Sequence, residues 1–244
     1  QPVKLHITRG LKIGDAQVIT SFRNHDTSQA AIFINVPVTN LSHQSITATI
    51  EASIEQITVR KAATLPPGDS VVKFTPAEFA QLNLQHPRLW WPNGYGPANL
   101  YKLHLEFKQE RNLSDSQDID FGVRKITYSV PGTDTLTSSV NGVPIFIRGG
   151  DWGLDEAMKR IPRERLDTQI HLHRLANLNL IRNWVGQSTS EDFYQLCDKY
   201  GILVWDEFFQ PNPNDGPNPT DIDTYIANVR DKVLRYRNHP SIML

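Results

Sequence analysis

The sequence is poor in cysteine, in long apolar runs and in clustered charge. A single cysteine, Cys197, occurs among 244 residues, so no disulfide bond can form within the chain. No apolar run approaches the roughly 20 residues that cross a bilayer. The 25 Lys and Arg residues are scattered and are balanced by 26 Asp and Glu residues, which gives a net charge of −1. We therefore predict that neither a membrane nor a nucleic acid is a partner of the chain.

Motifs for metals and nucleotides are also missing. Cys197 lies four residues after Phe193, an apolar helical spacing that predicts a packed thiol and not a metal ligand. His171 and His173 are two residues apart in a predicted helix and cannot bind one metal from the same face. No glycine-rich phosphate-binding motif follows a predicted strand. We predict that the chain has neither a metal site nor a cofactor.

The first 130 or so residues contain short segments in which apolar and polar residues alternate. Leu103, Leu105 and Phe107, for example, are separated by charged or polar residues. A period of two predicts half-buried strands. About seven such strands, separated by turn-forming residues, predict an immunoglobulin-like β-sandwich over residues 1–131. The predicted strands are Val3–Thr8, Ala16–Phe22, Ala31–Leu41, Ile46–Ile54, Ser70–Phe74, Leu100–Lys108 and Ile119–Val130.

From Pro144 onward the pattern changes to strands that alternate with helices. The spacings Ser188-x-x-Glu191 and Thr220-x-x-Asp223 predict the starts of the second and third helices, and Gly201 predicts the end of the second. The first helix is predicted from Arg163 to Ala176, after Pro162. The predicted strands are Ile145–Ile147, Leu178–Trp184, Ile202–Phe208 and Ser241–Leu244.

Repeated strand and helix units of this length predict a parallel sheet with right-handed crossovers. A doubly wound sheet and an eight-stranded barrel both begin in this way. The lack of nucleotide-binding motifs favours the barrel. A full barrel needs about 250 residues, so residues 132–244 are predicted to form the N-terminal part of a (β/α)8 TIM barrel. The predicted fold class is therefore multidomain, β followed by α/β.

Polar and aromatic residues gather where the predicted parallel strands end. In TIM barrels the chemistry lies on the loops that follow these carboxyl ends. A tryptophan face for the ring C–H groups, with arginine, carboxylate or amide groups for the hydroxyls, suits a sugar pocket. Trp205 falls inside an apolar run and is predicted to pack in the interior. The three strand ends read Arg148-Gly149-Gly150-Asp151-Trp152, Arg182-Asn183-Trp184 and Trp205-Asp206-Glu207.

Asp206 and Glu207 are adjacent carboxylates at the end of the third predicted strand. Adjacent strand residues point to opposite faces, whereas a retaining glycosidase needs two carboxyl groups about 5 to 5.5 Å apart across one bond. We predict that at most one of the two faces the pocket, and that the other pairs with an arginine or caps a neighbouring loop. Glu191 is assigned to its capping box.

Six motifs occur in a fixed order along the chain: Trp90-Trp91-Pro92-Asn93-Gly94-Tyr95-Gly96, Phe121-Gly122-Val123-Arg124, Asn141-Gly142-Val143-Pro144-Ile145-Phe146-Ile147-Arg148-Gly149, Ile181-Arg182-Asn183-Trp184, Phe193-Tyr194-x-Leu196-Cys197-Asp198-x-x-Gly201-Ile202-Leu203-Val204-Trp205 and Arg237-Asn238-His239-Pro240-Ser241. Together they resemble glycoside hydrolase family 2, and within it the β-mannosidase and exo-β-glucosaminidase branch. The resemblance implies an immunoglobulin-like domain followed by a (β/α)8 barrel that carries the active site.

The resemblance also implies a retaining exo-β-glycosidase with two catalytic glutamates, one after barrel strand four and one on strand seven. Because strand four is predicted at Ser241–Leu244, both glutamates are expected outside this chain, which would then be an inactive fragment. Arg182 is implied to lie beside the nucleophile, where its charge would keep that carboxylate ionised. The implied substrate-binding residues are Asp151, Trp152, Arg182, Trp184, Asp206 and Glu207.

The same resemblance narrows the substrate to an oligosaccharide or glycoside. The β-galactosidase branch carries a histidine shortly after the Arg-Gly of strand one, where this chain has Asp151-Trp152-Gly153-Leu154. The mannosidase branch usually continues strand two with glycines, where this chain has Val185-Gly186-Gln187-Ser188-Thr189. A β-mannoside, a β-glucosaminide or another β-glycoside therefore stays open, and a β-galactoside is disfavoured. The resemblance favours a periplasmic or secreted location.

An interrupted barrel has an exposed edge. A fourth strand without its neighbour would present unpaired backbone groups and apolar side chains, so we expect self-association through this edge. The alternative function, from a different class, is a non-catalytic carbohydrate-binding or interaction module formed by the β-sandwich. It ranks lower because the predicted sandwich strands show no exposed aromatic ladder.

Overall fold

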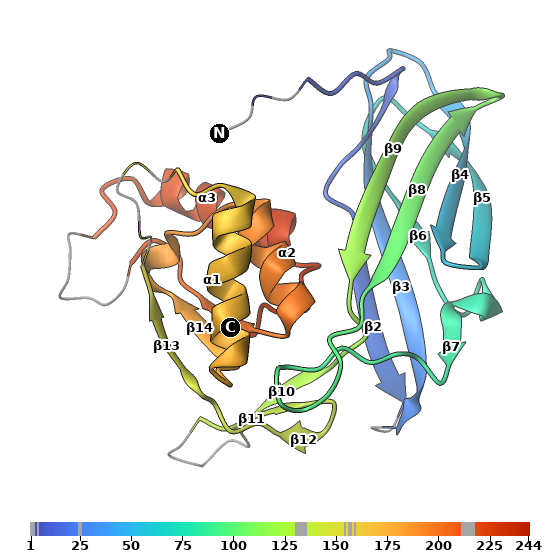
Figure 1. Ribbon diagram of the computed structural model, residues 1–244. Coiled ribbons are helices and arrows are strands. Elements are labelled where there is room, and N and C mark those ends of the chain that lie inside the picture. Colours follow the sequence, from blue (N-terminus) through green and yellow to red (C-terminus); the bar gives the residue numbers. More distant parts are fainter. Residues whose placement is uncertain are drawn as a thin grey trace. The chain divides into compact units, whose positions relative to one another are not determined.

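The computed structural model divides into two compact units (Figure 1). The first comprises residues 1–87 and 101–121, and the second comprises residues 88–100 and 122–244. The domain boundary expected between residues 131 and 132 stays a prediction. The residues that the structure describes are 3, 5–23, 26–129, 136–153, 155, 158, 160–210 and 218–244.

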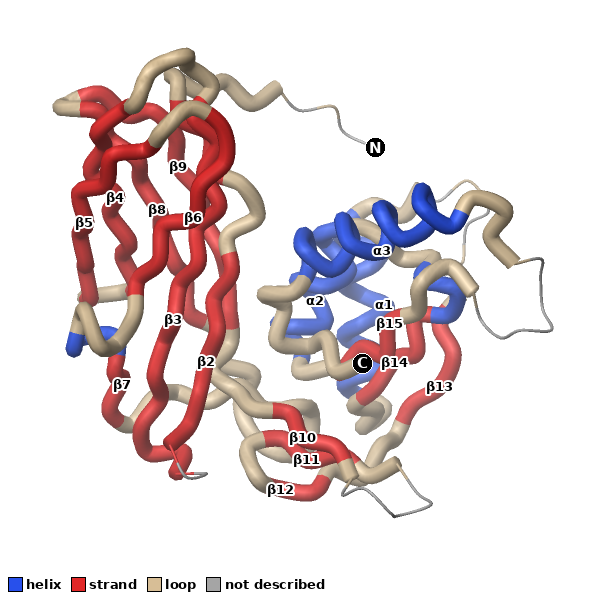
Figure 2. Tube along the Cα trace, turned by 180° about the vertical axis from the view of Figure 1, so that it is seen from behind, coloured by secondary structure: helices blue, strands red, loops and turns tan. Residues whose placement is uncertain are grey.

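The first unit consists of two antiparallel sheets. Its strands are β1 (Leu11–Ile13), β2 (Gln17–Arg23), β3 (Asp26–Asn40), β4 (Ile46–Ile54), β5 (Ile57–Leu65), β6 (Gly68–Phe74), β7 (Asn83–Gln85), β8 (Tyr101–Gln109) and β9 (Asn112–Phe121). In one sheet β3 pairs with β1, β2, β6 and β7, and the other sheet has the order β5-β4-β8-β9 (Figure 2). Ser114 and Asp115 of β9 bind the backbone N–H groups of Leu11 and Ile13, which ties the two sheets together. The predicted β-sandwich is confirmed.

Alternation predicted most of these strands because each buries one side. Ile32 and Ile34 of β3 are fully buried, whereas the residues between them are partly exposed. Two predicted strands were wrong, and the short strands β1 and β7 and the longer β5 were missed. The predicted strand Ile119–Val130 is interrupted, because β9 ends at Phe121 and the next strand, Ile126–Tyr128, belongs to another sheet. The described residues of 3–8 form no strand. Strand β5 was missed because it lies at the edge of its sheet and buries only Val59 and Leu65 of its nine residues.

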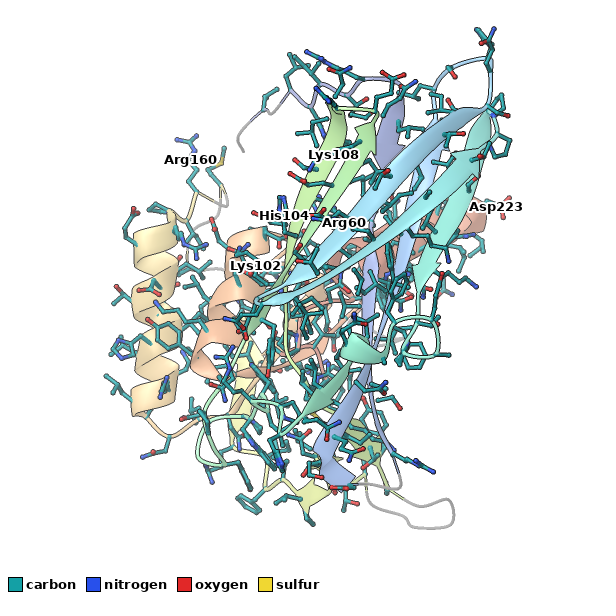
Figure 3. The ribbon with its side chains drawn as sticks, turned by 90° about the vertical axis from the view of Figure 1, so that its right-hand side faces the viewer. Arg60, Lys102, His104, Lys108, Arg160 and Asp223 are labelled. Carbon is teal, nitrogen blue, oxygen red and sulfur yellow. The ribbon has the colours of Figure 1, made fainter. Side chains whose placement is uncertain are left out.

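The four-stranded sheet carries basic side chains whose charges are already paired (Figure 3). The hydrogen bond that His104 donates to Asp118 raises the pKa of His104. These groups are partnered within the unit and do not form an unbalanced positive patch. The pairs are Arg60 with Glu51, Lys102 with Asp120, His104 with Asp118 and Lys108 with Glu106.

The second unit contains a small antiparallel sheet, a parallel sheet and three helices within its described residues. The antiparallel strands are β10 (Ile126–Tyr128), β11 (Ser138–Val140) and β12 (Val143–Pro144), and the parallel strands, in spatial order, are β13 (Gly149–Trp152), β14 (Leu180–Asn183) and β15 (Leu203–Asp206). The helices are α1 (Arg163–Leu175), α2 (Glu191–Tyr200) and α3 (Ile222–Tyr236). A parallel bridge joins Val204 to Ile242. The predicted start of a TIM barrel is confirmed, and the described residues contain no closed barrel.

The first parallel strand begins later than predicted, at Gly149 and not at Ile145. A Cβ atom on Gly149 would lie 2.1 Å from the carbonyl oxygen of Leu180, so only glycine lets β13 approach β14 this closely. Apolar periodicity does not reveal such a strand start, because glycine is depleted in strands and marks close backbone approach. Phe146, inside the predicted strand, is 74% exposed.

Two helix starts also differ from prediction. The N-cap of α2 is Ser190, whose side chain accepts from Phe193 N, and not Ser188. The N-cap of α3 is Asp221, which accepts from Thr224 N, and not Thr220. Gly201 ends α2 with a left-handed φ of 71°, as predicted. The Pro-rich loop at 211–217 lies outside the described residues.

The core of the second unit includes Cys197 and Trp90. Cys197 is fully buried on α2, as its spacing predicted, and burial raises the pKa of its thiol. Trp90 is also fully buried and donates its indole N–H to the carbonyl of Asp198 at 2.9 Å. Asn93 donates to the carbonyl of Leu178. Segment 88–100 therefore packs with the parallel-sheet unit. None of the described helices is long and apolar enough to span a bilayer.

Candidate functional site

The three parallel strands carry two rows of side chains on opposite faces. In the register of the sheet, the site row consists of Asp151, Arg182 and Trp205. One residue later, the helix row consists of Trp152, Asn183 and Asp206. Successive strand residues point to opposite faces, so the rows cannot mix. Members of the site row are exposed or half-buried, and members of the helix row are buried.

Arg182 is the centre of the site row. Its guanidinium bonds Asp151 Oδ1 at 3.1 Å and Glu207 Oε1 at 2.7 Å through Nε and 2.5 Å through a terminal nitrogen. It also lies 5.4 Å from the ring centroid of Trp205. The hydrogen bond to Glu207 is the main cause that raises the pKa of Arg182 above its ordinary value. A fixed positive charge therefore faces outward from the sheet.

The second oxygen of Glu207 holds the turn that follows β14. Glu207 Oε2 accepts from the backbone N–H of Val185 at 2.7 Å. Val185 has a left-handed backbone with φ 56° and ψ 12°, which is strained for a β-branched residue. This turn, the 3₁₀ segment Trp184–Gly186, carries the half-exposed ring of Trp184. Glu207 thus fixes both the arginine and the turn that presents a tryptophan.

Four aromatic rings at the ends of β14 and β15 are exposed; Trp205 lies against Arg182, Trp184 is carried by the turn after β14, and Phe208 and Phe209 lie over Lys232. Tyr225 of α3 donates its hydroxyl to the carbonyl of Phe208 at 2.6 Å, which anchors the segment after β15. Exposed rings beside a fixed cation and carboxylates suit a saccharide, whose C–H faces stack and whose hydroxyls accept or donate. The rings, with their exposed fractions, are Trp184 38%, Trp205 41%, Phe208 36% and Phe209 38%.

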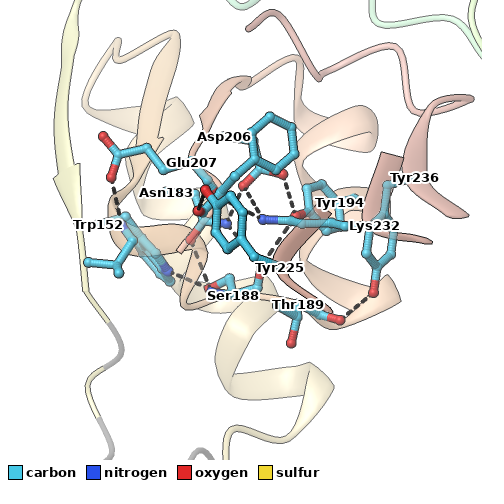
Figure 4. Close-up of polar contacts among 12 residues, drawn as sticks. Trp152, Asn183, Ser188, Thr189, Tyr194, Asp206, Glu207, Tyr225, Lys232 and Tyr236 are labelled. Atoms are coloured by element: carbon cyan, nitrogen blue, oxygen red, sulfur yellow. Dashed lines mark hydrogen bonds and ion pairs between the residues drawn. The ribbon is translucent and has the colours of Figure 1, made fainter. Parts of the chain in front are cut away.

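The helix row enters a buried polar network (Figure 4). The indole N–H of Trp152 donates to Ser188 Oγ at 2.9 Å. Asn183 donates to the Ser188 carbonyl and to Asp206 Oδ1, each at 2.9 Å. The ring of Trp152 meets that of Phe193 at 5.9 Å. Trp152 thus packs on α2, and Asn183 links β14 to Ser188 and to Asp206 of β15, on the face opposite the site row.

Both carboxylate oxygens of Asp206 accept hydrogen bonds within this network. Lys232 of α3 donates to Asp206 Oδ1 at 2.8 Å, and Tyr194 donates its hydroxyl to Oδ2 at 2.9 Å. The side chains of Lys232 and Asp206 are 5% and 6% exposed. Burial, with the charge of Asp206, raises the pKa of Tyr194 far above its ordinary value. The Asp206 carboxylate is therefore neutralised from the helix side.

The structure brings together four of the six residues predicted to bind substrate: Asp151, Arg182 and Glu207 form the ion cluster, and Trp184 follows on its turn. Trp152 and Asp206 lie on the opposite face, so they are not part of this cluster. Asp206 and Glu207 do point to opposite sides, as strand geometry predicted. Trp205, predicted to be packed, is instead 41% exposed beside Arg182. Whether any of them binds substrate stays a prediction.

Sequence reasoning missed Lys232. The spacing Thr220-x-x-Asp223 predicted the helix but not its buried face: Ile222, Ile226 and Val233 are exposed, whereas Lys232 and Tyr236 are buried. A buried lysine leaves no signature in apolar periodicity, because a charged residue is normally assigned to the solvent face. Its partner Asp206, a carboxylate in an apolar strand, was the one signal available.

A second charge cluster surrounds the buried ring of His239. Its ring bonds Asp198 Oδ2 at 2.5 Å through Nδ1 and Glu191 Oε1 at 3.2 Å through Nε2. Burial opposes protonation, but the charge of Asp198, its hydrogen bond and Glu191 raise the pKa of His239 to about 10. Asp198 also accepts from Ser241 N at 2.9 Å. Glu191 therefore serves this cluster and not the predicted capping box. Among the described residues, no group of three or more His, Cys, Asp or Glu side chains could hold a metal ion.

Comparison with known families identifies both halves of the chain. Residues 11–124 match the model of glycosyl hydrolases family 2, and residues 136–244 match the TIM barrel domain of the same family. The chain belongs to glycosyl hydrolases family 2. The resemblance deduced from the sequence motifs is thereby confirmed.

Relatives within family 2 cover nearly all of this chain. It is 31% identical to the mannosylglycoprotein endo-β-mannosidase of Lilium longiflorum over 99% of the chain, and 30% identical to the exo-β-D-glucosaminidase of Streptomyces avermitilis over 94%. The crystal structure of a β-D-mannosidase from Dictyoglomus thermophilum superposes over 96% of the chain with a TM-score of 0.84 and 26% identity. The chain spans 27%, 26% and 29% of the length of these three proteins.

Proposed function

We propose that the protein carrying this chain is a retaining exo-β-glycosidase that releases terminal β-linked sugars, and that a β-mannoside or a β-glucosaminide is its substrate. The observation that carries the proposal is the fixed cation Arg182 between Asp151 and Glu207, with the exposed ring of Trp205 beside it, at the carboxyl ends of parallel strands. This is where TIM-barrel enzymes place their chemistry. The activities for which the family 2 relatives are named support the same substrate class.

In this proposal the site face binds the sugar and does not cut the glycosidic bond. A retaining mechanism needs two carboxyl groups about 5 to 5.5 Å apart, one of which donates a proton while the other attacks. Asp206 is neutralised by Lys232 on the opposite face, and Glu207 accepts from Arg182 and from Val185 N. Both carboxylates are therefore occupied by contacts within the chain. This supports our proposal that the catalytic glutamates lie elsewhere and that these 244 residues alone do not hydrolyse a glycoside.

The test is hydrolysis of aryl β-glycosides by the protein in its complete natural length. We expect turnover of the aryl β-mannoside or β-glucosaminide with retention of the anomeric configuration, measured by NMR of the first product. Arg182→Met should raise KM by about tenfold or more, because a charge-assisted contact is lost and the Glu207 carboxylate loses its cation.

Arg163→Met is the matched control, since Arg163 is an exposed arginine that pairs with Asp192 away from the site. Its kinetic constants should equal those of the unchanged protein. Absence of turnover with every aryl β-glycoside would refute the proposal. If the protein cleaves internal bonds of an oligosaccharide and leaves terminal aryl glycosides intact, the enzyme is endo-acting and not exo-acting. The lily relative is named for such an endo action.

The alternative, a carbohydrate-binding sandwich, receives no support from the first unit. Within its described residues no aromatic side chain is among the exposed large hydrophobic residues, whereas the second unit exposes several. Saturable binding of oligosaccharides that is unaffected by Arg182→Met would favour this alternative.

A further inference from the structure

Glu207 can organise the site face only if its own backbone is fixed. It follows directly after the last residue of β15, where the sheet no longer constrains the chain. Lys232 supplies a constraint from α3, because its ammonium donates to the carbonyl oxygen of Glu207 at 3.0 Å while it bonds Asp206 at 2.8 Å. One buried cation therefore holds two successive residues that face opposite sides of the sheet.

The packing around this ammonium shows that the contact is built closely. A Cβ atom on Gly186 would lie 2.3 Å from the Glu207 carbonyl oxygen and 2.6 Å from Lys232 Nζ, so no side chain fits at this position. The ammonium also lies 5.7 Å and 5.3 Å from the ring centroids of Phe208 and Phe209. Lys232 thus touches the backbone of Glu207 and both exposed rings that follow it.

We propose that Lys232 is a positioning residue for the saccharide site, acting through Glu207 on Arg182 and on the Val185 turn that presents Trp184. The proposal rests on the proposed function and adds a residue of α3 that does not itself face the sugar. Lys232 fixes the Glu207 carbonyl, the Glu207 carboxylate fixes Arg182 and Val185 N, and the turn fixes the Trp184 ring. Misplacement of a binding group by about 1 Å costs up to a hundredfold in rate or affinity.

The competing role is charge balance, in which Lys232 only neutralises Asp206. The double variant Lys232→Met with Asp206→Asn separates the two roles, since it removes both buried charges and keeps an amide beside Asn183 and Tyr194. It restores neutrality without restoring the donor to the Glu207 carbonyl. The control is Lys199→Met, an exposed lysine of α2 that pairs with Asp167 at 3.0 Å.

The experiment measures three quantities in the protein of complete natural length: the thermal midpoint, KM with kcat for aryl β-glycosides, and the near-ultraviolet circular dichroism of the tryptophans. We expect the double variant to recover most of the midpoint lost by Lys232→Met, to keep a KM raised by about tenfold or more, and to show an altered tryptophan signal. Lys199→Met should change none of the three.

A double variant with the midpoint, KM and tryptophan signal of the unchanged protein would overturn the proposal, because Lys232 would then serve charge balance alone. If the double variant does not fold, KM and the tryptophan signal are measured for Lys232→Gln instead. This variant keeps an N–H donor without the charge. A protein that turns over no glycoside refutes the proposed function instead. The tryptophan signal then still reports whether Lys232 orders the Trp184 turn.

Discussion

The site row and the helix row come from the same three strands, one residue apart, yet their ion pairs exist in different environments. Arg182 and Asp151 have side chains that are 26% and 65% exposed. Lys232 and Asp206 have side chains that are 5% and 6% exposed. Solvent screens the exposed pair far more than the buried pair, so similar ion pairs have unequal energetic consequences. The exposed pair remains available to a ligand, and the buried pair supports the fold beneath it.

The comparison also shows that polarity at a strand end does not by itself identify a binding residue. Trp152 and Asp206 are residue types that a sugar site is expected to contain, but their polar atoms bond Ser188 and Lys232 instead. Asp151 and Arg182 satisfy one another and still face solvent. What separates the two rows is where the partners of each side chain lie, and this depends on the helices that cover one face.

The largest expected effect comes from breaking the buried pair. Asp206→Ala leaves the Lys232 ammonium without its anion inside the protein, and removal of one partner of a buried pair costs about 3–5 kcal/mol. Asp151→Ala removes an exposed partner and should cost about 1 kcal/mol or less. Urea unfolding followed by tryptophan fluorescence measures both free energies of unfolding.

Asp206→Asn is the matched control, because it keeps the size of the side chain and a group that can accept from Asn183 or Tyr194. Its cost should lie between those of the two alanine variants. Equal free energies for Asp206→Ala and Asp151→Ala would contradict the distinction between the rows, since both carboxylates would then behave as if exposed.

A second expectation concerns pH and the helix side of the unit, where His239 stacks on Tyr194 at 5.3 Å. The pKa of His239 is raised to about 10 from 6.5, so protonated His239 stabilises the folded state. This stabilisation is fully present below pH 6.5 and is lost as the pH rises towards 10. We expect the free energy of unfolding to fall by a few kcal/mol across this window.

His239→Gln should lower the stability at pH 6 and flatten the dependence between pH 6.5 and 10. His173→Gln is a suitable control, because His173 bonds the carbonyl of Gln169 in its own helix and forms no ion pair with any carboxylate that the structure describes. A slope that persists unchanged in His239→Gln would show that another group titrates in this range.

The fold class could be predicted from the sequence because the two-residue alternation of the strands and the helical spacing both reflect which side of each element is buried. Alternation in β3 and β8, and the apolar face around Cys197, follow directly from one-sided packing. Strand β13 was misplaced because its first two residues, Gly149 and Gly150, carry no side chain. Such a strand is defined by backbone approach to Leu180 and not by hydrophobicity.

The site could be predicted only to the level of strand ends. Arg182 and Glu207 were singled out because they lie at the carboxyl ends of two predicted strands and because the family resemblance implied a binding role for them. Lys232 could not be found, since its role depends on the orientation of α3 towards β15. Assignment of segment 88–100 to the second unit also escaped the sequence, because the strands on either side of it belong to the first unit.

The smallest expected effect tests the strain beside the site row. Val185 adopts φ 56°, a conformation that glycine adopts without steric cost, so Val185→Gly removes strain while it adds freedom to the unfolded chain. We expect the free energy of unfolding to change by no more than about 1 kcal/mol, towards greater stability.

Val71→Gly is the control, since Val71 is an exposed strand valine at which glycine should cost about 1 kcal/mol. A loss in Val185→Gly equal to that of Val71→Gly would mean that the turn stores no strain. If the turn does store strain, Val185→Gly should bind saccharide a few-fold more weakly in a titration. The reason is that the backbone N–H at position 185, which donates to Glu207, would belong to a more flexible turn.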